Sequence, residues 1–271
     1  QRTMAELSVL HGTHCSGTLL VEAKLIHSCG RVAHLEDVDV HANAPDGSLK
    51  DILTDGMARA RAAGCYKIIA SCPINALAAY EAQGFIDKGC QMRRTIEPTT
   101  TPDIAGWRTL RASLGEEHPY IVARPVAAGD FARGALALLA QLTVVGDVSA
   151  EDFAAHIASM DAAGTGLTLV LEATNTDTQP PPLVGIGTVL LARAPTSDGM
   201  TVVRAHIEDI VIDQSMRGRG VGAQLINCLV GAARSAGASL VLLECSRVNV
   251  PFYAKLGFEQ THTSMAYYFD P

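Results

Sequence analysis

The stretch HIEDIVIDQSMRGRGVGAQL, His206–Leu225, determines the expected fold. Its first seven residues read as a strand, and the apolar side chains that follow at helical spacing predict an amphipathic helix over 222–236. Gly237 comes next, and glycine is favoured where a helix ends in a left-handed cap. Between strand and helix lies RGRGVG, Arg217–Gly222. The stretch therefore predicts a strand, a glycine-rich turn and a helix in succession.

The glycine-rich turn has the composition of an anion site. Glycines let backbone N–H groups approach an anion closely, and a helix N-terminus adds positive potential. Arg217 and Arg219 supply charge for a pyrophosphate. The spacing is not that of a dinucleotide-binding fingerprint, and the Lys-Ser/Thr pair of a P-loop is absent. Taken alone, the string is equally compatible with an ordinary glycine-rich turn.

A similar pattern occurs earlier in the chain. HLEDVDVHANAPDGSLKDIL, His34–Leu53, matches His206–Leu225 at a spacing of 172 residues, and the spacing then becomes 173. The later matches are Arg61 with Arg234, Gly64 with Gly237, Cys72 with Cys245, Tyr80 with Tyr253, Gly84 with Gly257 and Phe85 with Phe258. So many ordered matches with one single-residue shift indicate a duplication rather than chance similarity.

The rest of each copy is expected to combine strands and helices. Strands are predicted at 7–10, 18–26, 167–171, 183–192, 240–243 and 265–269, with a short helix from about residue 250. The second copy opens with a strand and two helices, Ser149 and Asp152 forming a capping box, and the first copy lacks this section. Polar residues at 175–182 predict a hairpin loop. We expect domains at 1–95 and 120–271, joined by a linker at 96–119 that contains Trp107.

Composition and charge exclude several classes of function. Hydrophobic residues make up 48% and charged residues 18% of the chain, which indicates a globular protein. The net charge of −7 argues against general binding of nucleic acid or membrane surfaces. We find no apolar run of the roughly 20 residues that cross a bilayer, and no secretory signal. The seven cysteines form no CxxC pair and the nine histidines show no metal-binding spacing, so we expect a cytoplasmic protein with reduced thiols and no metal.

Together these motifs resemble the GCN5-related N-acetyltransferase superfamily. The resemblance rests on Arg-x-x-Gly-x-Gly after a strand, then helix, strand and NVPFYAKLGF, Asn249–Phe258. HIEDIVI, LTVVGDVSAEDF and LLECSRVNVPFYAKLGF are similar to the eukaryotic glucosamine-6-phosphate N-acetyltransferases, over about residue 120 to the C-terminus. In the first copy KLIHSCGRVAHLEDVDV, CYKII and MRR resemble the same family. The resemblance implies a mixed α/β sheet and two acetyltransferase-fold units in tandem, arranged as an intramolecular pseudo-dimer within a chain that is monomeric.

The same resemblance implies acetyl-coenzyme A (acetyl-CoA) as the cosubstrate. The turn would hold its pyrophosphate through Arg217, Gly218, Arg219, Gly220, Val221 and Gly222. Backbone groups of Ile210, Val211 and Ile212 would hold the thioester and pantetheine. Asn249 would also contact pantetheine, and Tyr253 would donate a hydrogen bond near the sulfur, unless it is a core tyrosine like its repeat Tyr80. The first copy has APDGSL in place of the turn and is not expected to bind coenzyme A.

Three acids are candidates for the chemistry of acetyl transfer, which needs a neutral amine and a polarised carbonyl. Consecutive strand residues point to opposite faces, so at most one of Glu208 and Asp209 is expected to face the amine. A structural role for the pair stays open, because Glu36 and Asp37 repeat it. Glu244 lies in an otherwise apolar strand, where a carboxylate is costly to bury. We predict Glu208, Glu244 and Tyr253 as catalytic and Asp209 as substrate-binding, and we expect Cys245 to be a buried structural thiol.

The two copies retain complementary residues. Thr143 matches a family position that contacts substrate, although a helix-end threonine is often only a cap. The first copy retains residues that the second has lost, namely Lys24, His27, Tyr66, Lys67, Arg93 and Arg94. They are either ordinary surface residues or the local cationic cluster that an acidic protein needs to hold a sugar phosphate. We predict the latter, with one active site assembled from both copies.

The sequence thus predicts an enzyme that acetylates glucosamine 6-phosphate. The product would be N-acetylglucosamine 6-phosphate, for UDP-N-acetylglucosamine biosynthesis, formed by direct transfer in a ternary complex. Two alternatives remain. One is an acetyltransferase that acts on a protein or polyamine amine, and the other is a non-catalytic regulatory module that binds coenzyme A.

Overall fold

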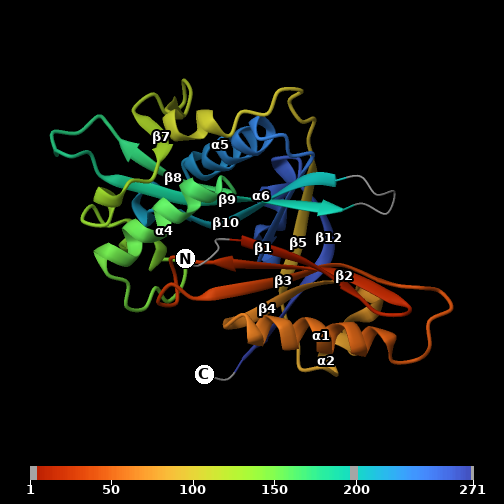
Figure 1. Ribbon diagram of the computed structural model, residues 1–271. Helices are drawn as coiled ribbons and strands as arrows, with labels where there is room; N and C mark the ends of the chain where they lie inside the picture. The colour runs from red at the N-terminus through yellow and green to blue at the C-terminus, as the bar shows by residue number, and fades with distance from the viewer. Residues whose placement is uncertain (1–4, 196–200, 270–271) are drawn as a thin grey trace. The chain divides into compact units, whose positions relative to one another are not determined.

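The computed structural model describes residues 5–195 and 201–269 (Figure 1). The chain forms two compact units. The first comprises Gln1–Lys24, Gly30–Arg94 and Leu242–Pro271, and the second comprises Leu25–Cys29 and Thr95–Val241. Both contain strands and helices, which confirms the predicted mixed α/β class. None of the described helices is long and apolar enough to span a membrane.

The first unit is built on a largely antiparallel sheet. Its strands are β1 (Ala5–His11), β2 (Cys15–Ala23), β3 (Arg31–Val40), β4 (Cys65–Cys72), β5 (Ile86–Thr95), β12 (Glu259–Tyr268) and the part of β11 (Leu240–Cys245) from Leu242 onward. They follow the order β1-β2-β3-β4-β12-β5-β11, and β3 and β4 pair in parallel. The helical segments are α1 (Ser48–Ala62), η1 (Ile74–Ala76), α2 (Leu77–Glu81), η5 (Arg247–Asn249) and α6 (Val250–Lys255).

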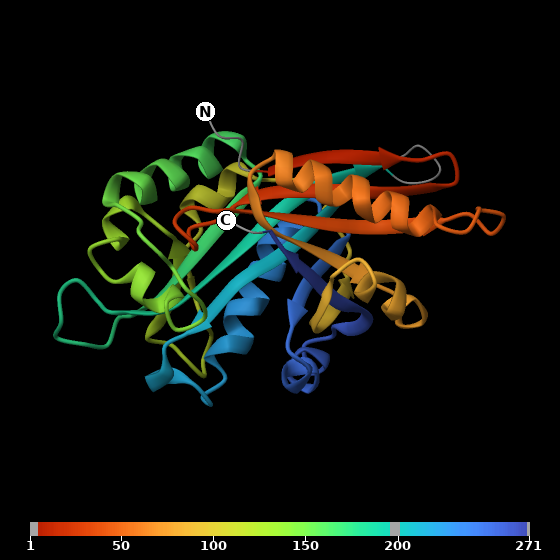
Figure 2. The same ribbon diagram turned by 90° about the horizontal axis from the view of Figure 1, so that it is seen from below.

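One hydrophobic core holds α1 against this sheet. Helix α1 runs along β2, β3 and β4 (Figure 2). Ile52 and Leu53 of the helix join Leu35 and Ile68 of the sheet in a single buried cluster. Met265 of the C-terminal strand β12 belongs to the same cluster and is fully buried. The last strand of the chain is therefore part of the core around the first helix.

The second unit has an antiparallel sheet in the order β10-β9-β8-β7-β6. Its strands are β6 (Ala112–Ser113), β7 (Ile121–Pro125), β8 (Gly166–Ala173), β9 (Leu183–Pro195) and β10 (Thr201–Ile212). The helical segments are η2 (Ala105–Thr109), η3 (Ala128–Asp130), α3 (Ala135–Leu139), α4 (Ala150–Ala163), η4 (Gln214–Met216) and α5 (Val221–Ser235). The polar segment at 175–182 connects β8 and β9, as predicted for a hairpin loop.

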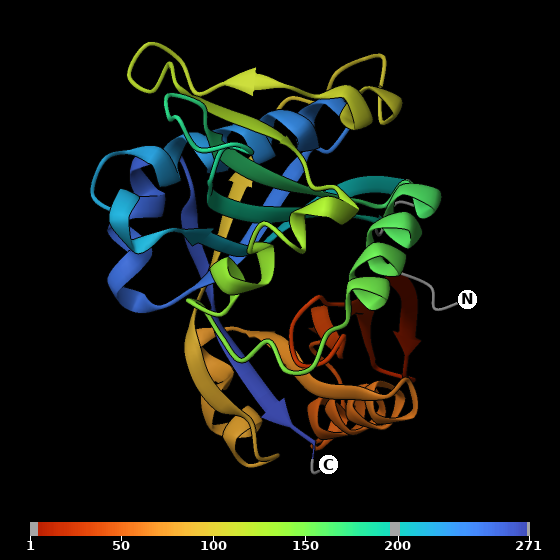
Figure 3. The same cartoon turned by 90° about the vertical axis from the view of Figure 1, so that its left-hand side faces the viewer.

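Helices cover both faces of this second sheet. Ile186 of β9 packs in one core with Leu138 of α3 and Phe153 of α4, and Figure 3 shows α4 lying on that side. A Cβ added to the next residue, Gly187, would meet Leu229 and Leu225 of α5. Successive strand residues face opposite sides, so α5 covers the face opposite α3 and α4. Ser149 caps α4 through the predicted capping box, its hydroxyl accepting from the Asp152 N–H at 3.0 Å.

Each unit contains a segment from the other sequence copy. Strand β12 of the second copy lies between β4 and β5 of the first copy and is antiparallel to both. In the opposite direction, Leu25 and Ile26 of the first copy are buried in the core of the second unit, with Phe153 and Ile186. The compact units thus follow contacts between copies, whereas the boundaries 1–95 and 120–271 describe the repeat and stay a prediction.

The elements of the two copies recur at a constant spacing. Helices α1 and α5 begin and end 173 residues apart, and so do β5 and β12. Ile52 therefore matches Leu225, and Leu53 matches Ile226. This places the one-residue shift in the loop before the helix, and not after Leu53 as the sequence comparison suggests.

The segment 96–119 packs onto the second unit. The Trp107 side chain is buried, and its Nε1–H donates to the Ala232 carbonyl at 3.1 Å and to the Ser235 hydroxyl at 3.2 Å, both on α5. The Asp103 N–H donates to the Ser235 carbonyl at 2.8 Å. These contacts explain why the stretch read as a linker contains η2 and β6.

Candidate functional site

A β-bulge interrupts β10 within the sequence HIEDIVI. The pairing of β10 with β9 shifts between Glu208 and Val211, and Asp209 has a φ of 53°. A positive φ is uncommon for a residue other than glycine, and a bulge leaves backbone groups outside the ladder. The strict alternation of side chains therefore does not hold through Asp209, and strand geometry no longer supports the expectation that Glu208 and Asp209 face opposite sides. Sequence reasoning missed this bulge.

The first copy has the same bulge in β3. The pairing of β3 with β2 shifts between Ser16 and Thr18, and Asp37 has a φ of 51°. Asp37 is the repeat partner of Asp209. The bulge is thus common to both copies and does not by itself distinguish a catalytic copy from a degenerate one.

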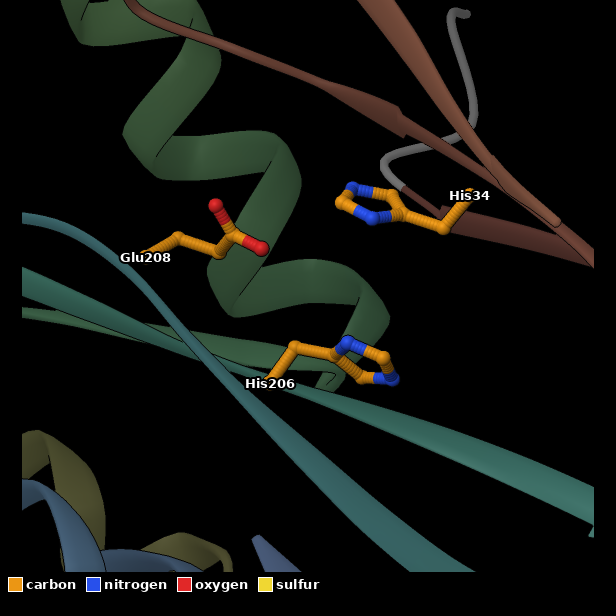
Figure 4. Close-up of side chains that lie close together, drawn as sticks. All are labelled: His34, His206 and Glu208. Atoms are coloured by element: carbon orange, nitrogen blue, oxygen red, sulfur yellow. The ribbon is translucent and has the colours of Figure 1, made fainter. Parts of the chain in front are cut away.

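His206 and Glu208 lie two residues apart on β10, and Figure 4 shows their side chains leaving the strand on the same side. The His206 side chain is buried and that of Glu208 is half-buried. Val211 belongs to the core of the second unit, while Ile210 and Ile212 are half-buried. Figure 4 also labels His34, which belongs to the first unit, where its Nε2 lies 3.0 Å from a carboxylate oxygen of Glu22.

The predicted anion-binding turn has the geometry that its glycines require. Gly218 and Gly220 have φ values of 75° and 83°, and Gly220 is the N-cap of the 15-residue helix α5. Arg217, Arg219 and both glycines are exposed. The N–H groups of a first helical turn have no carbonyl partner within the helix, and they lie at its positive end. An exposed turn with two arginines before such a helix suits a phosphate or pyrophosphate.

A glutamine outside the turn holds Arg217. The guanidinium donates from Nε to the Ile212 carbonyl at 2.9 Å and from Nη2 to the Gln141 side-chain oxygen at 3.1 Å. The same oxygen accepts the Gln214 N–H at 3.1 Å, and the Gln141 amide donates to Asp213 at 2.9 Å. Sequence reasoning missed Gln141, because a single glutamine 76 residues from its arginine carries no pattern.

The first copy retains the shape of the turn without its charge. Gly47 has a φ of 97° and is the N-cap of α1, 173 residues before Gly220. At the same spacing, Asp46 stands where the second copy has Arg219. The two turns therefore differ in charge rather than in backbone conformation.

Two predicted substrate residues from different copies meet in the second unit. The Thr143 hydroxyl lies 3.4 Å from His27 Nε2. The His27 and Ser28 N–H groups donate to the carbonyls of Val144 at 3.2 Å and Val145 at 2.8 Å. His27, Ser28 and Cys29 all have φ between 52° and 57°, a run of left-handed residues that persists only where its surroundings hold it.

The other predicted residues of the second copy lie in the first unit. Tyr253 is buried, with its ring edge-to-face against Phe258 at 6.0 Å, and Tyr80 and Phe85 repeat this arrangement at 5.7 Å. Asn249 is exposed at the end of η5. Arg247 of η5 makes a bidentate pair with Asp87 of β5, at 2.8 and 2.7 Å.

Glu244 is half-buried beside Cys245 on β11. Burial, with smaller effects from Cys90 and Glu244, raises the pKa of the Cys245 thiol to about 11. The thiol is protonated at neutral pH, which fits the expectation that Cys245 is structural and not a nucleophile.

The predicted phosphate-binding residues of the first copy differ in exposure. Lys24 is buried and pairs with Glu22 at 2.5 Å. Burial opposes ionisation of Glu22, but Lys24 and His34 prevail and hold its pKa well below the ordinary value. Arg93 is exposed, Tyr66 and Lys67 are half-buried, and the Arg94 guanidinium lies 5.9 Å from the ring centre of Phe258. Binding of phosphate by these residues stays a prediction.

Known proteins resemble this chain over its second half and in its fold. The acetyltransferase (GNAT) family matches residues 150–258. A probable glucosamine 6-phosphate N-acetyltransferase of Oryza sativa subsp. japonica is 33% identical over 158 residues, which cover 58% of this chain and 93% of that protein. The crystal structure of glucosamine-6-phosphate N-acetyltransferase from Arabidopsis thaliana is 28% identical, covers 55% of this chain and 99% of its own, and has a TM-score of 0.50. A GCN5-related N-acetyltransferase from Sphaerobacter thermophilus, 15% identical, shares the fold over 96% of this chain and 82% of its own, also with a TM-score of 0.50.

Proposed function

Because the chain belongs to the acetyltransferase (GNAT) family, we propose that it transfers the acetyl group of acetyl-CoA to the amine of glucosamine 6-phosphate. The observation that carries the proposal is the turn Arg217–Gly222. It combines two left-handed glycines, two exposed arginines and the N-terminus of α5, which together suit the pyrophosphate of coenzyme A. The acceptor is proposed from the names of the relatives and from the Thr143–His27 contact.

The reaction requires a neutral amine that attacks the thioester carbonyl carbon. The new C–N bond forms as the C–S bond breaks, the amine loses a proton, and the coenzyme leaves as a thiol once it has gained one. We assign Glu208 and Glu244 to orienting the amine and accepting its proton, and Tyr253 to donating a hydrogen bond near the sulfur. The acetyl group passes directly between the two bound substrates, without an acyl-enzyme, in keeping with the protonated Cys245 thiol.

The acceptor's phosphate is assigned to residues of the first copy. His27 is brought against Thr143 by the hydrogen-bonded run His27–Cys29, so one position from each copy lies at the same place in the second unit. Arg93 and Arg94 remain further candidates. The product, N-acetylglucosamine 6-phosphate, fits the synthesis of UDP-N-acetylglucosamine.

An acceptor panel tests the proposed reaction. The full chain is assayed with acetyl-CoA and, in parallel, glucosamine 6-phosphate, an N-terminal peptide, a lysine peptide and spermidine. We expect acetylation of glucosamine 6-phosphate with a kcat/KM at least a hundredfold above the others. Preferred acetylation of a peptide or of spermidine contradicts the acceptor. Tight acetyl-CoA binding without any transfer supports the regulatory module instead.

A conservative variant tests the phosphate assignment. Asparagine tolerates the left-handed backbone of His27, so His27→Asn removes the imidazole with little backbone cost. We expect the KM for glucosamine 6-phosphate to rise about tenfold, equivalent to about 1.4 kcal/mol, as for a lost hydrogen bond to a charged group. The KM for unphosphorylated glucosamine should not change, and neither should either KM in the control His11→Asn, an exposed histidine of β1. An equal rise for both acceptors in His27→Asn contradicts phosphate binding.

A further inference from the structure

Gln141 connects two parts of the second unit. It follows α3 directly, and its side chain makes three hydrogen bonds to the segment before the pyrophosphate turn. The oxygen accepts from Arg217 Nη2 and from the Gln214 N–H, each at 3.1 Å, and the amide nitrogen donates to Asp213 at 2.9 Å. All functional atoms of this amide are thus engaged with residues 213–217.

The residues after Gln141 form the acceptor-side loop, Leu142–Asp147. Thr143 lies in this loop, and the loop is held by the first-copy segment that carries His27. Ser28 contacts it twice, through its N–H to the Val145 carbonyl at 2.8 Å and through its hydroxyl, which accepts the Asp147 N–H at 3.1 Å. The loop therefore has two anchors, one on the pyrophosphate turn and one on the first copy.

We propose that Gln141 is a positioning residue that couples cofactor binding at Arg217 to the order of the acceptor-side loop. The inference rests on the proposed function for the identity of the acceptor. An anion that fixes the Arg217 guanidinium also fixes the Gln141 oxygen, and through the backbone the first residues of the loop. Coupling between binding sites is reciprocal, so a loop ordered by coenzyme A binds the acceptor more tightly, and the acceptor strengthens cofactor binding by the same factor.

The chemistry of a neutral amide suits this role. A glutamate at position 141 would form an ion pair with Arg217 and compete with the pyrophosphate for the guanidinium. It would also place a second carboxylate beside Asp213, whose pKa is held below its ordinary value first by the Ser215 hydroxyl and then by Gln141. The amide instead accepts from the cation and donates to the anion at once, which no other side chain except asparagine, one methylene shorter, can do.

Hydrogen exchange measures the coupling without any acceptor. Amide exchange of residues 142–147 is followed in the full chain with and without saturating coenzyme A. We expect coenzyme A to slow exchange there at least fivefold in the wild type and less than twofold in Gln141→Ala, with Gln260→Ala on β12, an exposed glutamine, as the control. Equal protection in the wild type and Gln141→Ala overturns the proposal, whatever the acceptor proves to be.

Kinetics gives an independent measurement once an acceptor is known. In the wild type, saturating acetyl-CoA should lower the dissociation constant of the acceptor several-fold, and Gln141→Ala should abolish that ratio while leaving thermal stability nearly unchanged. Gln141→Glu should raise the KM for acetyl-CoA about tenfold with a smaller effect on kcat. A purely structural role for Gln141 would lower stability and leave the ratio intact, which also overturns the proposal. Failure of the acceptor panel leaves the exchange result unaffected.

Discussion

Gly220 and Gly47 form a matched pair at the residue scale. Both adopt the left-handed conformation and cap the N-terminus of a 15-residue helix, but only the second-copy turn carries arginines. A side chain in this conformation costs roughly 1–2 kcal/mol for an L-residue other than asparagine or aspartate, so valine should lower stability similarly at either position. Any difference between the two variants in cofactor binding then reports on the turn itself.

Gly220→Val should remove the thermal stabilisation that acetyl-CoA gives to the full chain. The added side chain alters the turn and lies where N–H groups must approach the pyrophosphate. A ligand at a hundred times its Kd stabilises a protein by about 2.7 kcal/mol, which a melting curve detects easily. Gly47→Val should lose a similar amount of intrinsic stability but keep the full acetyl-CoA shift. An undiminished shift in Gly220→Val would show that the turn is not the pyrophosphate site.

At the scale of elements, local patterns predicted much of the fold. Helix α5 lies one residue from its predicted bounds, because its apolar spacing and its end at Gly237 are local signals. The capping box of α4 was equally local. Strand β12 begins at Glu259, six residues before the predicted start, because Glu259, Gln260 and Thr261 are exposed and carry no apolar alternation. Polar edges of strands are invisible to a search for buried runs.

The site was predicted in part for the same reason. The arginines and glycines of the turn are contiguous, so sequence alone located them. The bulges at Asp37 and Asp209 depend on how a strand pairs with its neighbour, and the Gln141 contacts join residues more than 70 positions apart. Both are properties of tertiary structure without a local signature. For Lys24, the sequence showed a basic residue but not its burial against Glu22.

At the scale of the whole molecule, the choice of partners could not be read from the repeat. The apolar pattern of β12 does not specify whether it pairs with strands of its own copy or of the other, since both copies offer similar strands. In the structure β12 lies between β4 and β5, and Leu25 and Ile26 join the core of the second unit. Each compact unit therefore contains residues of both copies, which makes the copies dependent on each other for folding.

This dependence predicts the behaviour of a divided chain. A fragment of residues 120–271 loses Leu25 and Ile26 from its core, at about 1.5–3 kcal/mol for each buried side chain, and leaves β12 with Met265 unpaired on both edges. Natural domains are stable by only about 5–15 kcal/mol, so we expect the fragment alone to aggregate or to lack a cooperative thermal transition. Coexpression of 1–119 with 120–271 should give a 1:1 complex that binds one acetyl-CoA and acetylates the acceptor of the intact chain. A folded, fully active monomer of 120–271, measured by light scattering and the same assay, would contradict the dependence of the second copy on the first.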